Sequence, residues 1–180
     1  MSADWNAVAT VHSEGYRDAR KILAAYGRVR PAAFFNVLTI TAEDPLALLD
    51  QLDQLAAAQP GIMNFISRVV PAKAAFDFSS REAFERQARE VVLAWAPDLR
   101  GKSFYVRMHR RGLREILESR GEERFIADVL LDATREMGEP ARISFEDPDV
   151  VLSIETVGDR AGLSFWTRED LRRYPFLRPD

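Results

Sequence analysis

The chain has no cysteine among its 180 residues, which excludes disulfide bonds, thiolate nucleophiles, iron–sulfur clusters and cysteine-based zinc sites. Histidine is almost as rare. Its two copies, His12 and His109, have no spacing typical of a catalytic triad or a metal-ligand pair. No run of 18 consecutive apolar residues and no secretory leader pattern is present. We therefore expect a cytoplasmic protein that does not associate with membranes.

Motifs for nucleotide and metal chemistry are also lacking. The sequence contains no Walker phosphate loop, no Rossmann glycine fingerprint, no His-Glu-x-x-His site and no G-x-S-x-G elbow. Glu146, Asp147 and Asp149 could together hold magnesium, but Pro148 between them favours a turn whose carboxylates accept backbone amides. We expect no metal site, no cofactor and no catalytic residue.

The sequence does contain an alternating strand, residues 102–112, that leads into a cluster of positive charge. Successive side chains of a strand point to opposite faces. One face is expected in the core, with Phe104, Val106 and Met108, and the other is available for a ligand, with Tyr105, Arg107 and His109. Residues 100–120 carry seven basic and two acidic residues in a chain of net charge −3. Such a local excess attracts a polyanion; an exposed charged edge with ordinary salt bridges is the alternative interpretation.

The first seventy residues alternate between strand and helix patterns. Strands are predicted over residues 6–12, 33–41 and 62–70, with a helix beginning near Ser13 and another capped by Asp44. The order β-α-β-α-β indicates a ferredoxin-like α/β unit that lacks one strand or takes it from elsewhere. The proline-containing segment 71–73 then interrupts the alternation and marks a domain boundary.

The pattern of the second part of the chain predicts the order α-β-α-β-β. Ser79-x-x-Glu82 and Ser119-x-x-Glu122 are predicted capping boxes, and Gly138 is expected to end the second helix. Strands follow over residues 150–157 and 162–167. The whole is an α+β protein. Glu155 lies in the middle of the first of these strands, where an arginine of the basic cluster could pair with it.

Three of these segments together resemble a THUMP domain: the strand of residues 102–112, the helix beginning at Glu122-Glu123, and the Asp147-Pro148-Asp149 turn with its strand. The resemblance implies a ferredoxin-like domain at residues 1–72 followed by a THUMP domain at 73–180, with a mixed sheet and flanking helices. The nearest resemblance is to stand-alone RNA-binding THUMP proteins, which are related in architecture to the adaptor of tRNA cytidine acetylation.

This resemblance implies that the chain binds tRNA at the acceptor stem and 3′ end, as a non-catalytic adaptor for a tRNA-modifying enzyme. We expect no enzyme activity in this chain and no binding to DNA. Arginine and lysine side chains would contact phosphates, and the tyrosine and histidine would stack or hydrogen-bond. The predicted RNA-binding residues are Arg68, Lys73, Lys102, Tyr105, Arg107, His109, Arg110, Arg111 and Arg114. The alternatives are a small-molecule-binding regulatory α+β domain, or an enzyme that uses His109 with Asp147 or Asp149.

Overall fold

The computed structural model describes residues 4–179 and divides into two compact units. The first comprises the chain up to Lys73 together with Leu171–Arg178, and the second comprises Ala74–Asp170. The C-terminal segment thus returns to the first unit, whereas the sequence interpretation assigned residues 73–180 to one domain. No helix in the described part of the chain is long and apolar enough to cross a membrane.

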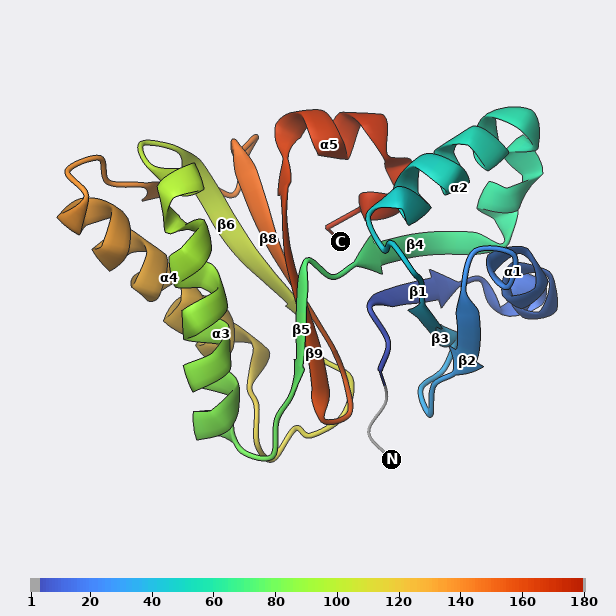
Figure 1. The fold of residues 1–180 in the computed structure, drawn as a ribbon, viewed down its shortest axis with the longest axis horizontal. Coiled ribbons are helices and arrows are strands. Elements are labelled where there is room, and N and C mark those ends of the chain that lie inside the picture. The colour runs from blue at the N-terminus through green and yellow to red at the C-terminus, as the bar shows by residue number, and fades with distance from the viewer. Residues whose placement is uncertain (1–3, 180) are drawn as a thin grey trace. The chain divides into compact units, whose positions relative to one another are not determined.

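The first unit is an antiparallel sheet of four strands with two helices. Its strands lie in the order β2-β3-β1-β4, which is the ferredoxin-like arrangement (Figure 1). The elements are β1 (Ala7–Val11), η1 (Ser13–Gly15), α1 (Tyr16–Leu23), β2 (Arg28–Pro31), β3 (Val37–Thr41), α2 (Ala47–Ala58), η2 (Pro60–Asn64) and β4 (Ile66–Pro71).

The strand missing from the sequence interpretation is β2, which pairs with β3 at the sheet edge. The predicted strand over residues 33–41 is too long. In the structure it begins at Val37, because Asn36 adopts a positive φ of 57° and turns the chain. Left-handed backbone of this kind cannot continue a strand. Likewise, residues 60–64 form the short helix η2, so β4 begins only at Ile66.

Helices α1 and α2 pack their apolar residues onto the sheet. Leu23, Leu48 and Leu52 are fully buried with strand residues such as Leu38. The segment η4 (Pro175–Leu177) adds Phe176 to the same cluster, also fully buried. Burial of such side chains stabilises a fold by about 1.5–3 kcal/mol each, so the C-terminal segment is an integral part of this unit.

The second unit is a mixed sheet of five strands, in the order β5-β9-β8-β6-β7. Strand β6 is parallel to both β7 and β8, while β9 is antiparallel to β8 and β5. Its elements are β5 (Ala74–Asp77), α3 (Arg81–Trp95), η3 (Ala96–Leu99), β6 (Ser103–His109), α4 (Ser119–Glu136), β7 (Arg142–Ile143), β8 (Val150–Val157), β9 (Arg160–Thr167) and the start of α5 (Arg168–Arg173). This confirms the predicted α+β class with a mixed sheet and flanking helices; strands β5 and β7 were not predicted.

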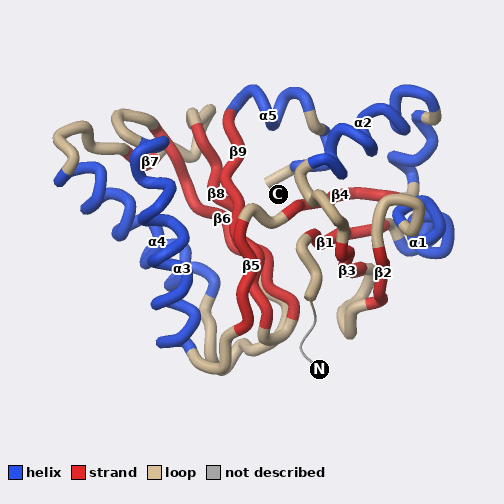
Figure 2. Tube along the Cα trace, viewed as in Figure 1, coloured by secondary structure: helices blue, strands red, loops and turns tan. Residues whose placement is uncertain are grey.

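Helices α3 and α4 lie side by side against this sheet (Figures 1 and 2). Their inward residues, including Phe84, Val92, Ile126 and Leu130, are fully buried with the core-facing residues of the strands. Gly138, with φ of +83°, follows the end of α4 as predicted.

Both predicted capping boxes of the second unit are wrong. Helix α3 is capped by Ser80 rather than Ser79, since the Ser80 hydroxyl accepts the Ala83 N–H. Helix α4 is capped by the Glu118 carboxylate, which accepts the backbone N–H groups of Arg120 and Gly121. A glutamate can replace serine as the cap because its carboxylate also interacts favourably with the positive end of the helix dipole.

Glu122 is therefore not a capping residue but a buried carboxyl between the two helices. Its side chain is 1% exposed and lies 3.1 Å from the Arg81 guanidinium, which also pairs with Glu85. Burial raises the pKa of Glu122 to about 7, and Glu85 adds to the shift while Arg81 opposes it. A carboxyl with a raised pKa in the folded state stabilises the fold less as the pH rises from 4.5 to 7.

We predict that Glu122→Gln stabilises the protein at pH 8, by about 1–2 kcal/mol after solvent screening. Wild type should lose stability between pH 4.5 and 7 relative to the variant, and the melting temperatures should converge near pH 4.5. Thermal melts across this pH range measure the effect. Glu90→Gln, an exposed position on α3, is the control. A constant difference between wild type and Glu122→Gln at every pH would contradict the prediction.

Candidate nucleic-acid interface

Strand β6 places its residues on two faces as its sequence predicts, but Tyr105 on the second face is also buried, at 7% exposure, and only Arg107 and His109 are partly exposed there. Phe104, Val106 and Met108 are buried in the core of the second unit. On the opposite face, the Arg107 guanidinium carbon lies 5.5 Å from the centre of the Tyr105 ring. This is within the range of a cation–π interaction, so the aromatic and basic side chains of this face form one surface.

One edge of β6 is largely open. The short strand β7 pairs only with Ser103 and Phe104, and no strand in the described residues continues this pairing toward the end of β6. Further along the same edge, the Met108 N–H donates to Oε1 of Glu123 from helix α4, at 2.9 Å. The segment between these two points, centred on Val106, is not covered by a strand.

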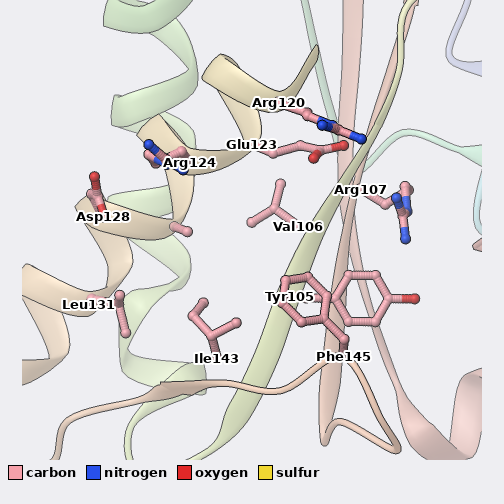
Figure 3. Close-up of a pocket in the computed structure, with 11 residues that line it drawn as sticks. Tyr105, Val106, Arg107, Arg120, Glu123, Arg124, Asp128, Leu131, Ile143 and Phe145 are labelled. Atoms are coloured by element: carbon pink, nitrogen blue, oxygen red, sulfur yellow. The ribbon is translucent and has the colours of Figure 1, made fainter.

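A groove of about 480 Å³ lies beside this open edge. Helix α4 forms its opposite wall, and the segment after β7 forms its end (Figure 3). The lining residues are Tyr105, Val106, Arg107, Arg120, Glu123, Arg124, Ala127, Asp128, Leu131, Ile143 and Phe145. Its volume falls in the range of sites that hold small ligands or single nucleotides.

Aromatic rings lie at one end of the groove. The Tyr105 and Phe145 rings are 5.7 Å apart with 32° between their planes, and Figure 3 shows them together below Val106. Phe145 is 72% exposed, an unusual environment for a large apolar side chain. An exposed ring next to guanidinium groups is a surface on which a nucleobase can stack.

The groove carries more positive than negative charge. Arg107 comes from β6, and Arg120 and Arg124 are one helical turn apart on α4. The carboxylates are those of Glu123 and Asp128. Guanidinium groups at a surface can bind phosphate oxygens in a bidentate manner, so the groove combines phosphate-binding and base-stacking side chains.

The basic residues after β6 have a different environment. Arg111 donates to Oε2 of Glu155 at 2.6 Å, and the other oxygen of Glu155 lies 3.4 Å from His109 Nδ1. Glu155 is 2% exposed and the Arg111 side chain 13%. The predicted pairing of Glu155 with an arginine of the cluster is confirmed. Arg111 therefore has a structural contact, whatever else it binds.

The remaining predicted residues do not gather at the groove. Arg110 donates to the Gly112 carbonyl within its own loop, while Lys102 and Arg114 are exposed before and after β6. Arg68 and Lys73 belong to the first unit, where Arg68 is 7% exposed and its Nε donates to the Arg178 carbonyl at 2.6 Å. Of the nine predicted residues, only Tyr105 and Arg107 line the groove.

Sequence reasoning missed Arg120, Arg124 and Phe145. The two arginines are four residues apart on α4, which places them on the same side of the helix, and this spacing was a usable signal. Phe145 precedes the Asp147-Pro148-Asp149 turn in a segment with no regular pattern. Nothing in that segment predicts that its ring meets Tyr105, because the contact depends on the parallel pairing of β6 and β7.

The Asp147-Pro148-Asp149 turn is a structural element, as predicted. Asp149 accepts hydrogen bonds from both the backbone N–H and the hydroxyl of Ser103, and these bonds hold the pKa of Asp149 below its usual range. Arg168 pairs with Asp147 at 2.7 Å. Among the described residues, no group of three or more histidine and acidic side chains is arranged to hold a metal ion.

Comparison with solved structures finds the same fold in larger proteins. PH1313 from Pyrococcus horikoshii matches with a TM-score of 0.60 and 14% identity, over 89% of this chain and 54% of that one. TrmN from Thermus thermophilus matches with a TM-score of 0.60 and 21% identity, over 89% and 44%. A 4-thiouridine synthetase, solved as an RNA complex with bound ATP, matches with a TM-score of 0.54 and 13% identity, over 91% and 42%.

The chain thus spans about half the length of these proteins. No protein-family model matches the sequence, and no curated protein matches it significantly. At these identities the likeness shows the fold alone. It supports a THUMP-like architecture, which is the fold that the sequence motifs imply.

Proposed function

We propose that the protein binds RNA through the groove between β6 and α4. The observation that carries the proposal is the combination of an open strand edge, two aromatic rings and three guanidinium groups in one concave site. Phosphates bind the guanidinium groups, and an unpaired base stacks on the exposed Phe145 ring. A structural salt-bridge network would not require an exposed aromatic ring next to an open strand edge.

The RNA that we propose is tRNA, bound at its acceptor stem and 3′ end, and the protein acts as a non-catalytic adaptor for a tRNA-modifying enzyme. The resemblance to THUMP domains supports this choice. So does the shared fold with a 4-thiouridine synthetase that has been solved in complex with RNA. Catalysis then belongs to the partner enzyme.

Salt-titrated binding of intact tRNA and of tRNA without its unpaired 3′ tail tests this function. We expect the affinity for intact tRNA to fall with salt, with a logarithmic slope of about 0.7–0.9 for each phosphate contact. Removal of the tail should weaken binding about tenfold, because the stacked base is absent. Equal affinity for both RNAs would leave only non-specific binding to phosphates and would overturn end recognition.

The alternative function, a small-molecule-binding regulatory domain, is favoured by one observation. Val106, Ala127, Leu131 and Ile143 give the groove an apolar wall, as in many small-ligand sites. Saturable binding of a free metabolite in this groove, together with no measurable affinity for tRNA at low salt, would select the alternative.

A further inference from the structure

The loop between β6 and α4 carries three arginines outside the groove, Arg110, Arg111 and Arg114. Arg111 is paired with Glu155, but in the described part of the chain no carboxylate pairs with Arg110 or Arg114. Arg110 donates only to the Gly112 carbonyl, at 2.6 Å, and its Nε is buried without a hydrogen-bond partner. A partly buried guanidinium without a counter-ion is uncommon in a folded protein. The loop therefore carries positive charge that the fold does not neutralise.

The backbone of the same loop changes hand at Leu113. This residue has a φ of +50°, a left-handed conformation that is uncommon for a residue other than glycine. Its C=O accepts the N–H groups of Ile116 at 3.0 Å and Leu117 at 2.9 Å, so the residues that follow it form a right-handed turn. A change of hand between successive residues brings their N–H groups together into a concave nest that binds anions. The N–H groups of this nest belong to residues 113–115.

The three N–H groups of the nest have no acceptor, although the loop itself is held in place. None of them donates to another group within residues 4–179. Just before the nest, the Arg111 N–H donates to the Thr156 hydroxyl at 3.2 Å, and the Arg111 C=O accepts the Gly158 N–H at 2.9 Å. Donors that are held in position before a ligand arrives lose less entropy when they bind it. The loop is therefore an ordered set of donors without an acceptor.

We propose that the loop of residues 110–115 binds a phosphate group. The N–H groups of the nest and the exposed Arg114 guanidinium donate to the phosphate oxygens, and the arginine charge is neutralised. Of the two nearby carboxylates, Glu115 is exposed, and Glu118 is already bonded as the cap of α4. The phosphate belongs either to an RNA backbone or to a free phosphate compound, which present the same group. Because no residue of this loop lines the groove, the proposal does not depend on RNA binding there.

Titration of the isotope-labelled protein with inorganic phosphate, followed by amide NMR spectra at constant ionic strength, tests this site. We expect the amide signals of residues 113–115 to shift and to saturate together. Arg114→Gln should weaken the affinity for phosphate about fivefold, because an exposed guanidinium contributes a screened ion pair. Arg89→Gln, at an exposed position on α3, should keep the affinity of wild type. Shifts that do not saturate, or equal weakening by both variants, overturn the proposal.

Addition of tRNA in the same experiment identifies the source of the phosphate. If an RNA phosphate occupies the nest, tRNA shifts the signals of residues 113–115 and prevents their response to inorganic phosphate. Arg114→Gln then lowers the logarithmic salt slope of tRNA binding by about 0.7–0.9. A response to inorganic phosphate that tRNA does not change assigns the site to a free phosphate compound. If neither ligand shifts these signals, the proposal is overturned, and tRNA shifts confined to the groove residues leave the proposed function intact.

Discussion

Replacing both Arg120 and Arg124 with glutamine should weaken tRNA binding by about tenfold or more at 0.1 M salt, and should reduce the logarithmic salt slope by about 1.4–1.8. The reason is that these two guanidinium groups on α4 line the groove, and the tRNA releases fewer counterions when two of its phosphates are no longer neutralised. Fluorescence anisotropy with labelled tRNA at several salt concentrations measures both quantities. The helix should remain folded, because both side chains are exposed and glutamine is a good helix former.

Arg135→Gln is the matched control for this experiment. Arg135 lies near the end of the same helix, outside the groove, and its pair with Asp132 is 71% exposed on both sides. Such a pair contributes little to stability. Its removal should change the affinity for tRNA and the salt slope by less than the loss of one phosphate contact would. If the control and the Arg120/Arg124 variant weaken binding equally, the groove is not the RNA site and the effect is one of net charge.

The sequence was sufficient to predict the parts of the fold that follow from local periodicity. Strand β8 matches its predicted range, 150–157, because this segment is rich in apolar and β-branched residues and lies between the Asp147-Pro148-Asp149 turn and Gly158. Strand β2 was missed because Arg28–Pro31 contains a single apolar side chain between arginines. An edge strand needs no buried face, so hydrophobic pattern carries no signal for it. The two-residue strand β7 is too short for any periodicity.

The candidate site was only partly predictable for a related reason. The alternation along β6 was enough to identify Tyr105 and Arg107, because it depends on one strand alone. The groove depends on the pairing of β6 with β7 and on the packing of α4 along the open edge, which are contacts between distant segments. Charge density alone pointed instead to Arg110 and Arg111, where the structure shows a bond to a loop carbonyl and one to a buried carboxylate.

The basic residues of the second unit therefore form two groups, those exposed in the groove and those bonded within the fold, and replacements in the two groups should have different effects. Arg120 and Arg124 are exposed in a groove, so their replacement should affect RNA binding and not stability. Arg111 is held by Glu155, so its replacement should affect stability first. An affinity measured for an Arg110/Arg111 double variant would therefore mix both effects unless the folded fraction is known.

Arg111→Met should lower the free energy of unfolding by about 2–3 kcal/mol, because it leaves the Glu155 carboxylate, 2% exposed, without its 2.6 Å partner. Methionine keeps most of the volume of the arginine stem, so the cost arises mainly from the charge. For a chain of this size the melting temperature should fall by about 5–10 °C. Addition of Glu155→Gln should recover part of this stability, since a neutral amide is less costly to bury than a carboxylate that has lost its guanidinium partner.

Arg114→Met is the comparison for this variant, because Arg114 is exposed in the same loop. Its stability should stay within about 0.5 kcal/mol of wild type. The two arginines differ in burial and not in charge, so a difference in melting temperature between the variants isolates the contribution of the buried pair. If Arg111→Met melts like wild type but binds tRNA more weakly, Glu155 does not need its partner and Arg111 contacts RNA directly. The basic cluster after β6 would then join the groove as part of the RNA-binding surface.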